Sequence, residues 1–136
     1  MSEPVNDSVR IPSRYLDLLN APLTAVLTTI GADGSPHAAP VWFFLDDQSV
    51  LVSTRADTQK HRNVARNARV SFTLIDPGNP MRYVELRGRA EVADDPTCAT
   101  RDRVVVKHGF ADGSSFDPPG ARRVSLRLVP THVIEH

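Results

Sequence analysis

The sequence is poor in several features that define large classes of proteins. It contains one cysteine, Cys98, so a disulfide within the chain, and with it a disulfide-stabilised secreted scaffold, is excluded. Its sixteen basic and sixteen acidic side chains cancel, which leaves no net field to attract nucleic acid or an anionic membrane. No apolar run in the sequence approaches the roughly 18 residues of a membrane-spanning helix. The opening residues, MSEPVNDSVR, lack the apolar stretch of a signal peptide, so we expect a cytoplasmic protein.

What remains is the composition of an ordinary globular domain. Hydrophobic residues make up 40% and charged residues 24% of the 136 residues, a balance that permits one hydrophobic core. We therefore expect a single domain over residues 1–136, with a flexible N-terminus over residues 1–10. The basic residues include only two lysines, and this excess of arginine is typical of proteins from GC-rich genomes.

Short alternations of apolar and polar residues, separated by turn residues, dominate the chain and predict β-strands. We predict six strands, over residues 23–30, 37–45, 50–53, 70–75, 83–92 and 123–134. Three stretches, residues 11–20, 58–67 and 96–108, have helical patterns, with Ser13 and Asp57 as N-caps of the first two. Six strands at hairpin spacing with few helices predict a mainly β fold, a small antiparallel barrel with short helices.

The loop over residues 109–120 (GFADGSSFDPPG) consists almost entirely of turn-forming residues. Its glycine, serine and aspartate content offers little apolar surface to hold it against the barrel. We expect it to be mobile in the free protein, to lie near a binding site, and to order only against a ligand or partner.

Hydroxyl and cationic side chains are concentrated in residues 53–63 (STRADTQKHRN), where a predicted strand ends and a predicted helix starts. Backbone N–H groups at a helix start donate to phosphate oxygens, and the helix dipole favours negative charge there. Lys60, in the first turn of the helix, adds a cation at the same point. A solvated loop followed by an exposed basic helix has the same composition. From the residues alone, the segment predicts either an anion site or an ordinary solvated surface.

The most apolar predicted strand contains Trp42, Phe43 and Phe44 and is apolar on both faces. Such a strand is either part of the core or a wall against which a flat ring packs. Because a barrel of this size does not readily bury these three aromatic residues alone, the strand also predicts an interface between two copies of the chain.

Motifs of hydrolytic and metal chemistry are missing. The sequence has no Gly-x-Ser-x-Gly elbow, no P-loop and no Gly-x-Gly-x-x-Gly fingerprint. Its five histidines are scattered, and the i, i+4 spacing of His132 and His136 does not converge at a strand end. We predict no metal site and assign no catalytic residue, and Tyr83, Arg82 and solvent stay open as sources of a proton.

Five segments, taken in order, carry a resemblance to a known family. They read ADGSPHAAPVWFFLDD, VLVSTRADTQKHRNVARNARVSFTLIDP, RYVELRGRAEV, RDRVVVKHG and RRVSLRLVPTHVI. From about residue 16 to 134 the chain resembles the pyridoxamine 5'-phosphate oxidase-like split β-barrels, which have the FMN-binding split-barrel fold. Within them it is similar to the actinobacterial branch of oxidoreductases that depend on the deazaflavin coenzyme F420.

The resemblance implies a homodimer of two six-stranded barrels with two cofactor sites at the interface, acting on a small-molecule substrate and not on nucleic acid or a membrane. In this family the second strand borders the isoalloxazine-type ring, and the strand-to-helix segment binds the phosphate or the acidic tail. The matching positions are Pro40, Val41, Trp42, Thr54, Arg55, Thr58, Gln59, Lys60 and Asn63.

Departures from the family pattern favour coenzyme F420 over FMN. The arginine and lysine that help grip the FMN phosphate in true pyridoxamine-phosphate oxidases are replaced by Ala39 and Phe44, and their C-terminal Arg-x-His motif is absent from RLVPTHVIEH. The implied activity is the transfer of a hydride between reduced F420 and a small unsaturated organic substrate. Two alternatives stay open: an FMN-dependent oxidoreductase, and a non-catalytic protein that stores or carries the cofactor.

Overall fold

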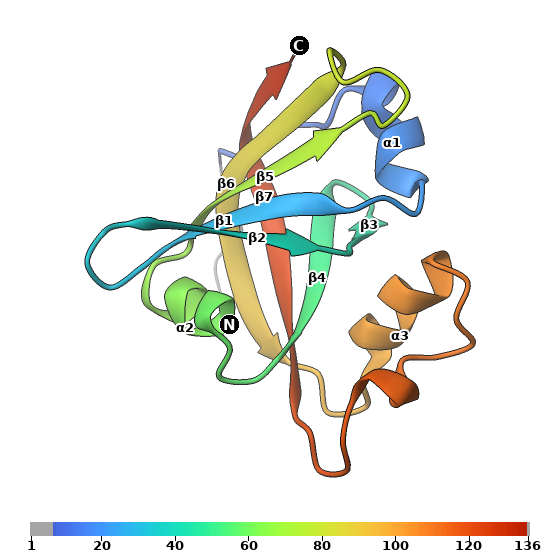
Figure 1. The fold of residues 1–136 in the computed structure, drawn as a ribbon. Coiled ribbons are helices and arrows are strands. Elements are labelled where there is room, and N and C mark those ends of the chain that lie inside the picture. The colour runs from blue at the N-terminus through green and yellow to red at the C-terminus, as the bar shows by residue number, and fades with distance from the viewer. Residues whose placement is uncertain (1–6, 136) are drawn as a thin grey trace.

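The computed structural model describes residues 7–135, and β-strands are its main regular structure (Figure 1). The seven strands are β1 (Ala25–Ile30), β2 (Pro36–Val41), β3 (Phe44–Asp46), β4 (Ser49–Arg55), β5 (Arg69–Ile75), β6 (Tyr83–Asp94) and β7 (Arg123–Glu135). The helical elements are the 3-10 turns η1 (Ser13–Tyr15) and η2 (Ser114–Phe116) and the α-helices α1 (Leu16–Asn20), α2 (Gln59–Arg66) and α3 (Ala99–Lys107). The prediction of a mainly β fold with short helices is confirmed.

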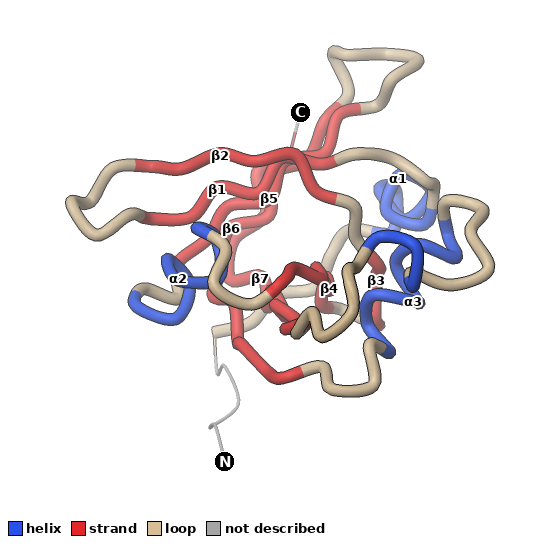
Figure 2. Tube along the Cα trace, turned by 60° about the horizontal axis from the view of Figure 1, so that its bottom comes forward, coloured by secondary structure: helices blue, strands red, loops and turns tan. Residues whose placement is uncertain are grey.

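All seven strands belong to one antiparallel sheet, in the order β2-β1-β5-β6-β7-β4-β3. The sheet curls into a partly open barrel (Figure 2). Its edge strands, β2 and β3, are consecutive in the chain, and only Trp42 and Phe43 separate them. The barrel is therefore split between these two edges, and the chain crosses the split at two aromatic residues. This is the predicted split β-barrel.

The prediction of one continuous strand over residues 37–45 is wrong, and it explains why six strands were expected and seven are found. β2 ends at Val41 and pairs with β1, whereas β3 begins at Phe44 and pairs with β4 at the opposite edge of the sheet. A single straight strand cannot pair at both edges, so the chain has to break. Between the two strands Phe43 is fully buried in the core, with its ring 5.0 Å from that of Phe72 in an edge-on contact.

The two predicted N-caps are also wrong. Residues 11–20 begin as a 3-10 turn that contains Ser13, and no side chain caps this turn. Asp57 lies one residue too early to cap α2, in a left-handed conformation with φ of 68°. Thr58 occupies the N-cap position, but its hydroxyl contacts that of Thr54, 2.9 Å away. Helix α2 therefore starts without a side-chain cap.

The hydrophobic core fills the inside of the curled sheet. Alternate residues of the strands enter it, as predicted from the alternation, and Leu27, Phe72, Leu86 and Leu126 are at most 3% exposed. Each such side chain contributes about 1.5–3 kcal/mol when it is fully buried. Helix α1 packs against β3 and β5 (Figure 1). None of the helices between residues 7 and 135 is long and apolar enough to cross a membrane.

The long strands β6 and β7 pair with one bulge. The register shifts between Arg87 and Gly88, opposite Thr131 of β7. Gly88 lies so close to β7 that a Cβ atom on it would stand 2.0 Å from the carbonyl oxygen of Val129. Only glycine fits at this position, and the bulge bends the strand pair in the way that a curled sheet requires.

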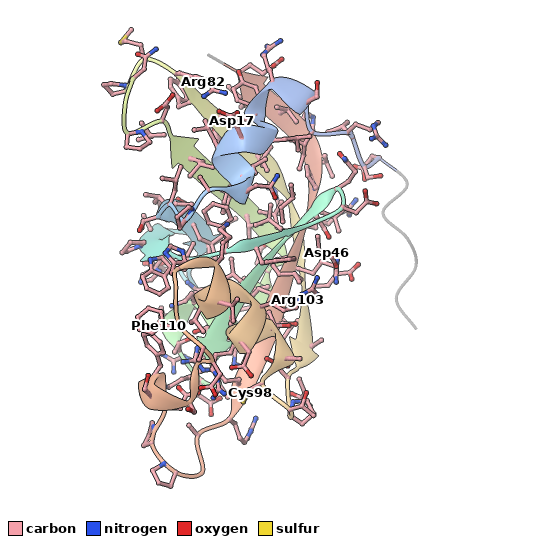
Figure 3. All side chains as sticks on the ribbon, turned by 90° about the vertical axis from the view of Figure 1, so that its right-hand side faces the viewer. Asp17, Asp46, Arg82, Cys98, Arg103 and Phe110 are labelled. Carbon is pink, nitrogen blue, oxygen red and sulfur yellow. The ribbon has the colours of Figure 1, made fainter. Side chains whose placement is uncertain are left out.

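Ion pairs help to hold α1 and α3 beside the sheet (Figure 3). Arg82, just before β6, forms an ion pair with Asp17 of α1 at 2.7 Å. On α3, the Arg103 guanidinium lies 4.3 Å from the centre of the Phe44 ring and 3.8 Å from an Asp46 carboxylate oxygen, both on β3. Helix α3 is thereby held against one edge of the split.

Two predictions fall partly or wholly on the chain ends. Residues 1–6 of the predicted flexible N-terminus and His136 lie outside the described residues. Within the described part, the Val9 N–H donates to the Pro130 carbonyl at 3.0 Å, so residue 9 is joined to β7.

Candidate cofactor site

A pocket of about 480 Å³ opens beside the split of the barrel. Its lining comes from the end of β2, the strands β4 and β7, the helices α2 and α3, and the η2 turn. The volume lies within the range of roughly 300–1,000 Å³ that is typical of small-molecule sites. The pocket has an apolar side and a cationic side.

Pro40, Val41 and Trp42 form the apolar side. The Trp42 indole stacks on His108 with the ring centroids 3.7 Å apart and an angle of 7° between the planes. The rings of Phe110 and Phe116 pack near it at 6.1 and 6.2 Å. These contacts fix the indole, and they come from the same chain. Trp42 and Phe44 nevertheless stay partly exposed, so the expectation that a second copy of the chain covers the aromatic run stays a prediction.

Lys60 is the cation that the sequence placed at this site. It stands in the first turn of α2, half-buried, and lines the pocket. Burial, and then the positive charge of Arg123, lower the pKa of the Lys60 ammonium below its ordinary value. Among the residues that the structure describes, no carboxylate forms an ion pair with it. A partly buried cation without a counter-ion is unfavourable, and a bound anion relieves that cost.

Three arginines converge on one carboxylate next to Lys60. The buried Asp117 side chain accepts hydrogen bonds from Arg123 at 2.6 Å, Arg101 at 2.9 Å and Arg55 at 3.2 Å. These bonds, that of Arg123 first, hold the pKa of Asp117 far below its ordinary value against the opposing effect of burial. Arg101 and Arg123 line the pocket, and Arg55 does not. The cationic side of the pocket therefore consists of Arg101 and Arg123 as well as Lys60.

The nine residues predicted for the site divide into two groups. Four of them, Pro40, Val41, Trp42 and Lys60, come together in the pocket lining. The other five are absent from the lining and are Thr54, Arg55, Thr58, Gln59 and Asn63. A direct role of these five in cofactor binding stays a prediction.

Asn63 illustrates how a residue of the second group acts on the site from outside it. It is fully buried, and its Nδ2 donates to the Thr29 hydroxyl at 2.9 Å. Its Oδ1 accepts from Gln59 at 2.7 Å and from Arg66 at 3.0 Å. Asn63 therefore ties α2 to β1 and, through the helix, fixes the position of Lys60.

The loop over residues 109–120 has anchors within the chain, which the expectation that it orders only against a ligand or partner did not include. Asp117 attaches it to three arginines, and Phe116 packs against Trp42. The prediction that it lies near the site is consistent with Phe116 lining the pocket. Its mobility in the free protein stays a prediction.

Arg101 and Arg123 line the pocket but were not assigned from the sequence, whereas Ser53 lines it from the predicted segment of residues 53–63 without being one of the nine assigned residues. Arg101 and Arg123 lie in a helix and at a strand start, and only the tertiary fold joins them. A cross-strand signal exists, because Arg55 and Arg123 face each other in the pairing of β4 with β7. Using it would have required knowing that these two strands are neighbours.

A larger groove of about 910 Å³ is lined by residues of β1, β5, β6 and β7. None of the nine predicted residues lines it. Two of its arginines have carboxylate partners, Arg87 with Glu85 at 2.9 Å and Arg89 with Asp7 at 3.0 Å. We assign the cofactor site to the smaller pocket because it joins an aromatic wall to a cation, Lys60, that has no carboxylate partner among residues 7–135.

The curled antiparallel sheet and the pocket beside its split define a split-barrel protein with a site suited to a molecule that carries both a flat ring and an anionic group. Comparison with known families is consistent with this class. Residues 11–136 match the family model described as pyridoxamine 5'-phosphate oxidase, and the chain belongs to this family. The resemblance found in the sequence is thereby confirmed.

Similar proteins with assigned activities are named reductases. The F420H(2)-dependent biliverdin reductase of Mycobacterium tuberculosis is 33% identical over 126 residues, which cover 91% of this chain and 87% of the relative. The 5a,11a-dehydrotetracycline/5a,11a-dehydrooxytetracycline reductase of Streptomyces rimosus is 43% identical over 118 residues, 79% of this chain and 70% of the relative. A solved structure named F420 reductase superposes with a TM-score of 0.79 at 35% identity and covers 91% of this chain and 98% of that one. A conserved hypothetical protein from Mycobacterium tuberculosis gives 0.77 at 26% identity, with 98% and 89% covered.

Proposed function

We propose that this protein is a coenzyme F420-dependent reductase that transfers a hydride from the reduced deazaflavin to a small unsaturated organic substrate. The observation that carries the proposal is the pocket, in which Pro40, Val41 and Trp42 face the same space as the unpaired Lys60. Two relatives support the proposal, because both are named reductases and the name of one states that it depends on F420H(2).

The pocket residues fit the chemistry of this cofactor. A deazaflavin cofactor joins a flat ring system to a phosphate and an acidic tail. The proline and indole side of the pocket suits the ring, because aromatic faces favour offset stacking. Lys60, with Arg101 and Arg123 beside it, suits the phosphate. Ring and anion can then be held at once by one chain.

The contribution of the chain to the reaction is binding, orientation and exclusion of water. The deazaflavin supplies the hydride chemistry when it is bound. The contacts of His108 and Phe116 with Trp42 keep the ring wall in one orientation, and the buried side chains of Val104 and Val105 add apolar surface to the lining, which helps to exclude water. A fixed orientation of two reactants is one of the larger contributions that a protein makes to a transfer reaction.

Neither side chain left open as a proton source lines the pocket. Arg82 donates to Asp17 and to Asp76, and these bonds raise the pKa of its guanidinium still further. Tyr83 also lies outside the lining. We therefore assign protonation of the product to solvent.

A cofactor carrier is the second candidate, and one observation favours it. The side chains that line the pocket include no histidine, aspartate, glutamate or tyrosine, so an obvious acid or base is absent from the described lining. Such a pocket also suits a protein that stores the cofactor. Binding of FMN in place of F420 is the alternative within the same enzyme class.

Turnover distinguishes these candidates. Reduced F420 is mixed with the protein and a panel of quinones, enones and tetrapyrroles, and its oxidation is followed by absorbance. We expect acceleration over the protein-free rate with at least one member of the panel. Tight binding of F420 without acceleration by any member would support the carrier and reject the reductase.

We also propose that the protein is a homodimer with the cofactor sites at its interface, as the family resemblance implies. An obligate interface of this kind buries more than roughly 2,000 Å². Light scattering at micromolar concentration is expected to give about twice the mass of one chain. A clean monomer at that concentration would contradict both the interface and the shared site.

A further inference from the structure

The cationic side of the pocket keeps a net positive charge even though its arginines form ion pairs. Four cations and two carboxylates meet there, and they are Lys60, Arg55, Arg101 and Arg123 with Asp102 and Asp117. Asp112 also acts electrostatically on Arg101, which leaves the group with an excess of one positive charge. A partly buried excess of positive charge favours an anionic ligand such as a phosphate.

The orientation of Arg123 is set by Asp117. Arg123 Nε and Nη2 both donate to this carboxylate, at 2.9 and 2.6 Å, in the fork geometry that fixes the plane of a guanidinium. The remaining nitrogen, Nη1, lies 3.5 Å from the Ser53 hydroxyl oxygen. Ser53 and Arg123 both line the pocket, next to Lys60. Nε and Nη2 of Arg123 are thus used by Asp117 for positioning. Nη1 remains on the side of the guanidinium that faces the Ser53 hydroxyl.

Asp117 also makes the crowding of arginines possible. Arg55 and Arg123 are direct neighbours across β4 and β7, an arrangement in which like charges repel. Asp117 accepts hydrogen bonds from both arginines, and its negative charge offsets the repulsion between them. Arg55 donates in addition to the carbonyl of Phe116 and does not line the pocket, whereas Arg123 does.

We propose that Arg123 is the second cationic ligand of the cofactor's anionic group, beside Lys60, and that Asp117 is the positioning residue that orients it. The inference rests on the proposed function. Arg123 then has the role that the sequence suggested for Arg55. Because Asp117 follows Phe116, which packs against Trp42, one carboxylate fixes both the second cation and part of the aromatic wall.

Asp117→Asn separates positioning from simple electrostatics. The substitution keeps the shape of the side chain and removes one negative charge next to the site. If only the net charge mattered, an anion would bind more tightly to the variant. If Asp117 orients Arg123, an anion binds more weakly, because the guanidinium loses its charge-assisted fork. The two explanations predict opposite signs.

The test measures the Kd of F420 for the wild-type protein and for four variants, with thermal unfolding of each as a check on folding. Arg123→Gln is expected to weaken binding by roughly 10- to 100-fold, and Arg123→Lys, which keeps the charge without the fork, by less. Asp117→Asn is expected to weaken it by roughly 10-fold. Asp33→Asn is the matched control, because Asp33 is an exposed turn carboxylate that accepts hydrogen bonds from Ser35 and lies outside the pocket lining. Its Kd is expected to equal that of the wild type.

A second measurement needs no cofactor. The side-chain resonance of Lys60 is followed by NMR during titration with pH and then with inorganic phosphate. Arg123→Gln is expected to raise the pKa of Lys60, since the charge of Arg123 is one cause of its lowering. Phosphate is expected to shift the Lys60 resonance in the wild type and much less in Arg123→Gln.

The outcomes separate this inference from the proposed function. If the wild type binds no F420 but its Lys60 responds to phosphate through Arg123, the anion site stands and the cofactor is wrong. If a folded Arg123→Gln variant binds both F420 and phosphate as tightly as the wild type, the inference is overturned and the function stands. Tighter binding by Asp117→Asn overturns the positioning role.

Discussion

Replacing Lys60 by alanine tests the assignment of the pocket. The ammonium lines the pocket, is half-buried, and has no carboxylate partner among the described residues, so its hydrogen bonds are available to a ligand. A hydrogen bond between charged groups contributes roughly 1.5–3 kcal/mol, so Lys60→Ala is expected to weaken binding of F420 by about 10- to 150-fold. Lys60→Arg is expected to restore part of the loss, since it returns the charge with a different geometry.

The same substitution is expected to have little effect on folding. Burial and Arg123 lower the pKa of Lys60 in the folded protein, so at pH values between the lowered pKa and the ordinary value of 10.5 the unfolded chain binds more protons. At neutral pH the charged lysine therefore disfavours the folded state, and removing it does not lower stability through charge. The free energy of unfolding of Lys60→Ala is expected to stay within about 1 kcal/mol of the wild type.

The assay is the change in Trp42 fluorescence on titration with F420, at low and at high salt. Salt is expected to weaken binding to the wild type more than to Lys60→Ala, because screening acts on the contact that the variant lacks. Arg62→Ala is the control, since Arg62 is an exposed cation of the same helix outside the pocket lining. If Lys60→Ala binds F420 and FMN as tightly as the wild type does, residues 53–63 are an ordinary solvated surface and the assignment fails.

Three further predictions concern stability. Asn63→Ala is expected to lower the free energy of unfolding in urea by about 2–4 kcal/mol, because it removes three buried or partly buried hydrogen bonds and leaves the Thr29 hydroxyl without its donor; a loss below about 0.5 kcal/mol would contradict the anchoring role. Gly88→Ala is expected to cost at least about 1–3 kcal/mol, since the new Cβ collides with the Val129 carbonyl, and unchanged stability would show that the bulge is misdescribed. Burial lowers the pKa of Lys107 to about 8, so the unfolded chain binds the extra proton between pH 8 and 10.5, and the stability of the wild type is expected to rise over that window. Urea denaturation at both pH values is expected to show a smaller rise for Lys107→Met. An equal rise in the variant would refute the lowered pKa of Lys107.

The parts of the fold that sequence reasoning predicted correctly are those determined by local patterns. Alternation along residues 70–75, 83–92 and 123–134 reports which side chains enter the core, and β5, β6 and β7 follow it closely. The break at Trp42 and Phe43 follows instead from pairing at opposite edges of the sheet. That pairing is a property of the whole fold, and it cannot be predicted from a run of apolar residues.

The candidate site divides in the same way. Lys60 and the Pro40–Trp42 segment could be found because each lies in a contiguous stretch with a recognisable chemistry. Arg101, Arg123 and Asp117 come from a helix, a strand and a loop, and their association depends on how these elements pack. Local sequence offers no reason to prefer Arg123 to any other arginine of the chain.

The most direct test of the central claim is a parallel titration of the wild-type protein with F420 and with FMN in the same buffer, followed by the fluorescence of Trp42, the only tryptophan in the sequence. Because Trp42 lines the pocket, a ring bound there is expected to quench it. The expected result is saturable quenching by F420, tighter than that by FMN and weakened by salt. Tighter binding of FMN, or no saturable change with either cofactor, would contradict the claim.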